Sequence, residues 1–215
     1  ARLASMGYAT AQRQAFSDAL LEVGADAPTL CEGWSAYDLA SHCWVRERSI
    51  KALIGIGSQR FAHLAEREMG DARERHGFVE LASLLREGPR LLATLLPGGD
   101  DLFNALEYYV HTEDVRRANG LPRRPLDPDF EDMVWKRLRQ LGRSFFAKVP
   151  VGVLLERTDA DEPPMRVRSG AATVTLLGRP TELLLFTFGR KDAADVRLIG
   201  DPESVDAVQR ADLGA

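Results

Sequence analysis

Residues 102–111 read Leu-Phe-Asn-Ala-Leu-Glu-Tyr-Tyr-Val-His. Within them Glu107 and His111 stand four residues apart, so a helix places both on one face, which Phe103 and Val110 share. A carboxylate in so apolar a strip costs several kcal/mol unless a basic group or a metal ion compensates it. The stretch therefore predicts a helix over residues 101–118 that carries either a partly exposed Glu-His pair or two metal ligands.

Helical spacing of apolar residues continues on both sides of this stretch. Gly24 ends a first helical pattern, Ser35 and Asp38 resemble a capping box that opens a second, and Asp127 with Pro128 opens the last. The predicted helices cover residues 8–23, 35 to about 54, 78–96 with an interruption at 88–89, 101–118, and 127 to about 148. The polar stretch 58–69 fits either a helix or a lid.

The apolar period changes near residue 150. Short apolar or alternating runs predict strands over residues 151–156, 165–168, 172–177 and 196–199, and two short helices are predicted over 180–188 and 202–209. The sequence therefore predicts an α+β protein with two domains. Residues 6–149 form a helical bundle, and residues 150–215 form a small α/β domain close to the lower size limit for independent folding.

Composition limits the class of protein. The chain has 215 residues, of which 45% are apolar, so it can bury a core and is not disordered. No stretch approaches the roughly 18 consecutive apolar residues of a membrane helix, and no leader is recognisable, so we expect a soluble, cytoplasmic protein without a membrane partner. A net charge of -4 without a basic block argues against nucleic-acid binding.

The two cysteines are too few for a disulfide framework or a zinc site made of cysteine alone. A metal site must therefore use histidines and carboxylates. His42, in the apolar run of residues 39–45, lies on a different predicted helix from Glu107 and His111. A single histidine on an apolar face is more often a core residue than a ligand, but these three together supply two nitrogens and one oxygen. Such a set leaves a fourth position for water or a thiolate, as in catalytic zinc sites.

Asp38, one turn before His42, either accepts the second ring N–H of that histidine or caps the helix together with Ser35. The remaining histidines lie in polar surroundings and are expected to face water, and both cysteines are expected to be packing residues outside the metal site. These four unassigned residues are His63, His76, Cys31 and Cys43.

Two motifs resemble a known family. Residues 29–42, Thr-Leu-Cys-Glu-Gly-Trp-Ser-Ala-Tyr-Asp-Leu-Ala-Ser-His, followed by Arg-Glu-Arg at 46–48, are similar to the N-terminal motif of the mycothiol-dependent maleylpyruvate isomerases, a branch of the DinB-like four-helix bundles. Residues 107–118 resemble the second motif of that family, in particular of an uncharacterised actinobacterial subgroup described as metal-binding. Residues 181–185, 189–190 and 200–201 resemble the small sterol-carrier-like domain that follows the bundle in these proteins.

The resemblance implies a divalent metal, usually zinc, held by His42, Glu107 and His111. It also implies mycothiol as a thiol cofactor, which the metal would ionise so that it attacks an electrophilic double bond or a leaving-group carbon. We therefore expect a metal-dependent and thiol-dependent isomerase or S-transferase, whose partners are a small-molecule thiol and an electrophilic substrate.

Three arginines are candidates for binding the substrate or the cofactor. Arg46 shares the helical face of His42 and can either orient a carboxylate of the substrate or cofactor or pair with a neighbouring acid. Arg48 is a further candidate for cofactor binding. The isomerases use an arginine of the smaller domain at the active site, and in this chain Arg190 is the residue that we assign to that role.

Two other classes of function use the same three ligands. The first is a non-catalytic metal-holding or small-ligand-binding module. The second is a metal-dependent hydrolase with water as the nucleophile, for which the sequence offers no obvious additional general base. Either a monomer or a homodimer is compatible with the sequence.

Overall fold

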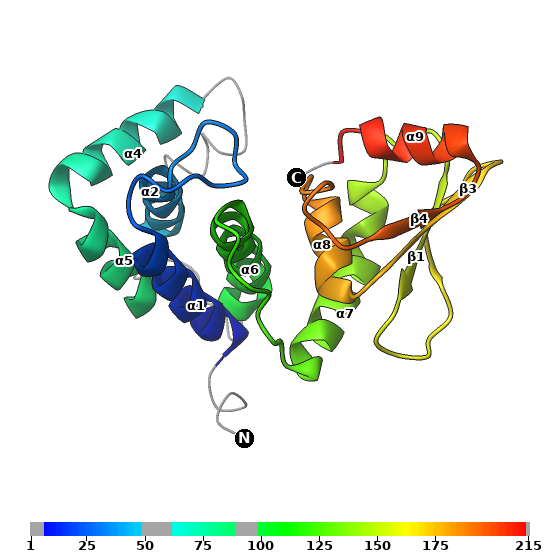
Figure 1. Ribbon diagram of the computed structural model, residues 1–215, viewed down its shortest axis with the longest axis horizontal. Coiled ribbons are helices and arrows are strands. Elements are labelled where there is room, and N and C mark those ends of the chain that lie inside the picture. Colours follow the sequence, from blue (N-terminus) through cyan, green and yellow to red (C-terminus); the bar gives the residue numbers. More distant parts are fainter. Residues whose placement is uncertain (1–6, 49–61, 89–98, 214–215) are drawn as a thin grey trace. The chain divides into compact units, whose positions relative to one another are not determined.

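The computed structural model describes residues 7–48, 62–88 and 99–213. Its contacts divide the chain into two compact units, Ala1–Arg123 and Arg124–Ala215, which we call the helical unit and the sheet unit (Figure 1). The described part of the chain is a mixed α+β protein. In the helical unit it contains α1 (Tyr8–Val23), α2 (Ala36–Arg48), α4 (Ala62–Arg75), α5 (Phe78–Glu87) and α6 (Gly99–Ala118).

The apolar faces of these helices form the core of the helical unit. Helix α1 contacts α5 and α6, while α2 contacts α4 and α5. Gly24 has φ of +91°, a conformation that favours glycine, and ends α1 where the sequence predicts. The buried core joins residues from α1, α2, α5 and α6, including Phe16, Leu20, Leu39, Leu85 and Tyr108.

The sheet unit contains α7 (Pro128–Phe145), β1 (Gly152–Arg157), β2 (Met165–Arg168), β3 (Thr173–Gly178), α8 (Pro180–Thr187), β4 (Arg197–Ile199) and α9 (Pro202–Arg210). The strand order is β2-β1-β3-β4. The central pair β1/β3 is parallel, and both outer pairs are antiparallel. Helix α7 packs against α8 and β2, while α8 and α9 contact β3 (Figure 1).

Helix α7 belongs to the sheet unit, so the division falls between Arg123 and Arg124 and not between residues 149 and 150 as we expected from the sequence. The reason is the packing of α7 on α8 and β2. A Cβ atom added at Gly142 would lie 2.6 Å from Cγ1 of Val167, so the absence of a side chain there lets helix and strand approach. The DinB-like and sterol-carrier-like assignments of the two domains stay predictions.

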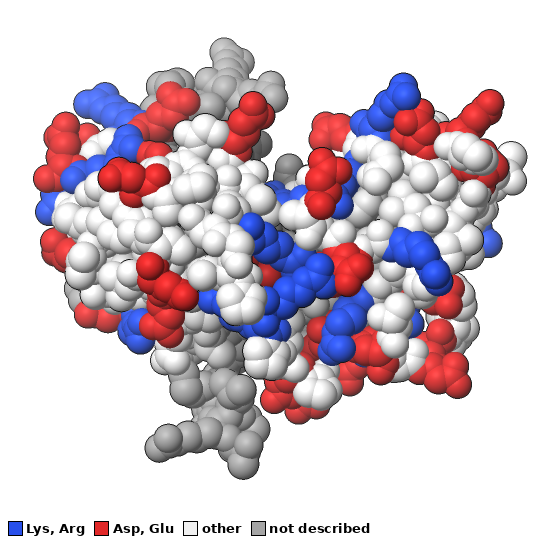
Figure 2. All heavy atoms as spheres, viewed as in Figure 1, with Lys and Arg blue, Asp and Glu red and all other residues white. Residues whose placement is uncertain are grey.

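The predicted elements agree with the described ones in type. Helix α1 and strand β2 have the predicted bounds, and the stretch that fitted a helix or a lid is helical from Ala62 onward. Residues 49–54 and 89–96 of two predicted helices lie outside the described residues. None of the helices described is long and apolar enough to cross a membrane. Acidic and basic side chains are both present on the visible face of each unit (Figure 2).

Candidate metal centre

The structure brings His42 of α2 together with Glu107 and His111 of α6. One potential ligand atom from each residue lies within 4.8 Å of those of the other two. The two imidazole rings have centroids 5.5 Å apart and are nearly perpendicular, and His111 Nε2 lies 3.7 Å from Glu107 Oε1. Both histidines are buried, whereas the Glu107 side chain is 29% exposed. These three residues therefore form a group that can hold a metal ion and that solvent reaches beside Glu107.

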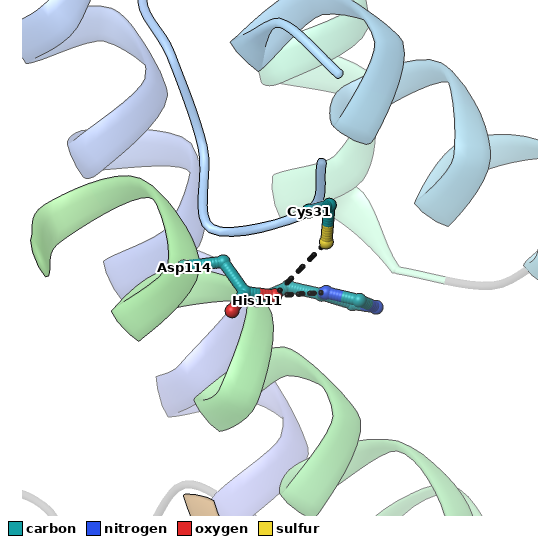
Figure 3. A group of neighbouring side chains, drawn as sticks. All are labelled: Cys31, His111 and Asp114. Carbon is teal, nitrogen blue, oxygen red and sulfur yellow. Dashed lines mark hydrogen bonds and ion pairs between the residues drawn. The ribbon is translucent and has the colours of Figure 1, made fainter. Parts of the chain in front are cut away.

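The two ring nitrogens of His111 have different surroundings. Nδ1 lies 3.0 Å from Oδ2 of the buried Asp114, one turn further along α6. Nε2 is buried, and the described residues offer it no hydrogen-bond partner. In Figure 3 this second nitrogen points away from Asp114. A buried ring nitrogen without a hydrogen bond, next to a carboxylate oxygen and a second imidazole, fits a metal ion.

The charge states of the three side chains also suit a cation. Burial, reinforced by the nearby charge of His111, lowers the pKa of His42 to about 3, so this ring is neutral at pH 7. Burial alone would raise the pKa of Glu107, but the nearby His111 ring and the charge of Arg46 lower it to about 2. At neutral pH the group thus offers a neutral imidazole and a carboxylate without losing a proton from either.

His111 behaves differently from His42. Burial by itself would lower its pKa, but the buried Asp114 carboxylate, which accepts a hydrogen bond from Nδ1, raises it well above the ordinary value together with other acidic neighbours. In the metal-free protein His111 is therefore cationic at neutral pH, and its Nε2 must release a proton before it can bind a metal ion.

Arg46 lies at the edge of the candidate metal centre. Its Nε is 3.5 Å from Glu107 Oε1, and its Nη1 donates a hydrogen bond of 2.8 Å to Asn104 Oδ1. The ion pair that the sequence left as one alternative is therefore present. The guanidinium of Arg46, which belongs to α2, thus pairs with the carboxylate of Glu107 on α6. The ring of Trp34, in the loop before α2, packs against His42 at a centroid distance of 5.1 Å.

The other two predicted arginines donate to backbone carbonyl oxygens. Arg48 donates from Nη2 to the carbonyl oxygens of Leu84 and Gly88, both at 3.1 Å, at the end of α5. These bonds cap the end of α5, and the predicted contact of Arg48 with a cofactor stays a prediction. Arg190 is in the sheet unit, where Nη1 donates to the carbonyl oxygen of Phe188 at 2.6 Å. Its predicted role at an active site stays a prediction.

The capping alternative for Asp38 is confirmed. Its Oδ2 accepts hydrogen bonds from Ser35 N at 3.0 Å and Ser35 Oγ at 2.7 Å, and the Ser35 hydroxyl accepts in turn from Asp38 N at 3.2 Å. This is the reciprocal pattern of a capping box. The other carboxylate oxygen pairs with Arg73. Asp38 therefore fixes the start of α2 and does so without a hydrogen bond to His42 in the described structure.

The unassigned histidines and cysteines behave differently from one another. His76 pairs with Glu80 at 2.9 Å, outside the candidate centre, and the His63 side chain lies outside the described part. Cys43 is buried in the core as expected. Cys31 corrects the expectation that both cysteines only pack, because its Sγ donates to Asp114 Oδ2 at 3.3 Å (Figure 3). Sequence reasoning missed Asp114, although its position three residues after His111 was a readable signal.

Comparisons with protein-family models, with curated proteins and with solved structures gave no match. The candidate metal centre therefore rests on the geometry of its own residues.

Proposed function

We propose that the helical unit binds one divalent cation, zinc, through His42, Glu107 and His111. The observation that carries the proposal is the buried Nε2 of His111, which has no hydrogen-bond partner among the described residues and faces a carboxylate oxygen at 3.7 Å. Two imidazoles and one carboxylate are the ligand set of open zinc sites, in which a fourth position takes water or a substrate atom. The partial exposure of Glu107 supports access to that position.

We further propose that the cation serves thiol chemistry. When bound, it would lower the pKa of a thiol in the open position, so that a thiolate is available at neutral pH. The thiol implied by the resemblance is mycothiol, and the reaction is isomerisation or S-transfer to an electrophilic carbon in a DinB-like, maleylpyruvate-isomerase-like protein. In this chain Arg46 orients the Glu107 carboxylate, and the two buried histidines exclude water from the inner side of the site.

The test begins with protein purified without a histidine tag. We expect one zinc per chain by elemental analysis. In calorimetric titrations with mycothiol, we expect the zinc-loaded protein to bind the thiol and the metal-free protein not to bind it. Absence of stoichiometric metal would overturn the metal site. Zinc-loaded protein that neither binds mycothiol nor transfers it to electrophiles would overturn the thiol chemistry alone, and would favour the non-catalytic module.

Zinc binding should release a proton. Because the pKa of His111 is raised and those of His42 and Glu107 are lowered, we expect about one proton per zinc at neutral pH, coming from His111 Nε2. The apparent affinity for zinc should therefore rise with pH until His111 is deprotonated in the metal-free protein. Calorimetric titrations in buffers of different ionisation enthalpy measure the number of protons released. A release of no proton at pH 7 would contradict the raised pKa of His111 in the metal-free protein.

A further inference from the structure

We propose that Asp114 and Cys31 act together as positioning residues for the metal ligand His111. They hold its ring with Nδ1–H directed at Asp114, so that Nε2 is the nitrogen presented to the cation. This inference rests on the proposed function, because it assumes the metal site. It adds two residues that are not part of the ligand set and assigns them control over the affinity for the metal.

The first support is the hydrogen bonding of one carboxylate oxygen. Oδ2 of Asp114 accepts from His111 Nδ1 at 3.0 Å and from Cys31 Sγ at 3.3 Å (Figure 3). Asp114 is fully buried, so water does not compete for this oxygen. A deprotonated carboxylate is acceptor-only, which requires a hydrogen on Nδ1. A metal-bound imidazole is neutral and carries a single hydrogen, so the cation is left with Nε2.

The second support is the loop between α1 and α2, which fixes Cys31 against α6. Leu30 N donates to the backbone oxygen of Asp114 at 3.1 Å. The Thr29 hydroxyl lies within hydrogen-bond distance of two backbone oxygens, 3.2 Å from Cys31 O and 2.9 Å from Trp34 O. These contacts stabilise the turn that contains Cys31. The thiol is therefore held in place by backbone contacts on both sides.

The same loop also touches the other histidine ligand, because the Trp34 ring packs on His42. One short segment thus contacts His42 through an aromatic ring and His111 through the Asp114 carboxylate. Since His42 comes from α2 and His111 from α6, this loop is the element that couples the ring orientations of two ligands from different helices. We therefore expect substitutions in this loop to change the affinity for the metal ion even though none of them replaces a ligand.

A competing possibility is that Cys31, His111 and Asp114 themselves hold the cation, because their potential ligand atoms also lie within 4.8 Å of one another. His111 belongs to both groups, and a neutral ring has one free lone pair, so one cation uses Nε2 or Nδ1 but not both. Binding at Nδ1 would displace the proton that Asp114 now accepts and would make the thiol of Cys31 a thiolate ligand. Spectroscopy separates these cases.

The experiment measures the affinity for zinc by competition with a chromophoric chelator. We expect Asp114→Asn to weaken zinc binding about 10-fold to 100-fold, the usual effect of removing an outer hydrogen-bond partner of a ligand histidine. Cys31→Ala should weaken it less, and Cys31→Ser, which keeps a donor, should restore most of the loss. Asp18→Asn is the matched control, because this exposed carboxylate of α1 pairs with Arg86 and is not one of the potential metal ligands, so the affinity should stay unchanged.

Two readouts report on position and not on folding. In zinc-loaded protein with 15N-labelled histidine, the ring of His111 should carry its hydrogen on Nδ1 and bind through Nε2. The cobalt-substituted protein should lack a thiolate-to-cobalt charge-transfer band. Unchanged zinc affinity in a folded Asp114→Asn variant would overturn the inference, and so would a thiolate band that disappears in Cys31→Ala. Absence of zinc binding by the unaltered protein would instead overturn the proposed function, and with it the role of both residues.

Discussion

Replacing His111 with alanine is expected to abolish stoichiometric zinc binding. His111 supplies the buried ring nitrogen that faces Glu107, and without it only His42 and Glu107 of the ligand group stay in place. Two ligands do not make a zinc site of either the structural or the catalytic type. The affinity should therefore fall by more than about 100-fold, the upper range for the loss of an outer-shell partner. Elemental analysis after dialysis and a chelator competition titration measure the loss.

The matched control is His76→Ala. That histidine pairs with Glu80 outside the candidate metal centre, so its removal tests whether the loss is specific to the ligand. We expect the control to retain one zinc per chain. Circular dichroism verifies that both variants are folded. A folded His111→Ala protein that still holds one zinc per chain with unaltered affinity would refute the ligand assignment.

Elements marked by local chemistry could be predicted from the sequence. Helix α1 has its apolar period ended by a glycine at φ of +91°, and α7 has Asp127 accepting from Asp129 N with Pro128 in its first turn. In both cases the residues that predict the helix end lie within a few residues of that end in the structure. The same holds for the Ser35 and Asp38 capping box. Local signals of this kind do not depend on what the element later packs against.

The division of the chain could not be predicted in the same way. The helical period of residues 128–145 shows that α7 has an apolar face, but not which surface covers it. That surface is β2 and α8, and the close approach at Gly142 shows how tightly they fit. The predicted division at residues 149–150 followed the change from helices to strands, which is a change of element type. The observed division follows from which elements pack together. The apolar period of a single segment does not show which elements will cover it.

The candidate metal centre shows the same limit. Glu107 and His111 could be paired from their spacing, since four residues form one helical turn. His42 could be grouped with them only by its ligand type and apolar setting, and the resemblance strengthened that grouping, because nothing in residues 39–45 says which helix that face meets. Cys31 stands 83 residues before Asp114, so the sequence offered no signal for their contact. It arises from the fold of the loop that precedes α2.

Replacing Arg13 with methionine is expected to destabilise the helical unit by about 3 kcal/mol, at the lower end of the cost of breaking a buried ion pair. Arg13 of α1 donates from Nε at 2.9 Å and from Nη2 at 2.6 Å to Glu47 Oε1 of α2. The two side chains are 2% and 1% exposed. The variant leaves a buried carboxylate whose next cation, Arg48 Nη1, is 3.7 Å from Oε2. Urea unfolding measures the change.

The pH dependence identifies the cause of this loss. Burial raises the pKa of Glu47, and the charge of Arg13 opposes that rise, so the pKa should rise further in the variant. A carboxyl group whose pKa is higher in the folded than in the unfolded state binds protons more tightly when folded. Stability then falls as the pH rises through the interval between the two values. The deficit of Arg13→Met should therefore shrink as the pH is lowered and Glu47 becomes protonated.

Two further variants complete the comparison. Arg86→Met removes a cation whose side chain is 42% exposed and whose partner, Asp18, is 66% exposed, so it should cost no more than about 1 kcal/mol. The double variant Arg13→Met with Glu47→Met replaces both charges by apolar groups and should recover most of the stability, since neither charge of this pair is then left buried without the other. Equal losses in Arg13→Met and Arg86→Met would show that burial of the Arg13 pair does not set its energy.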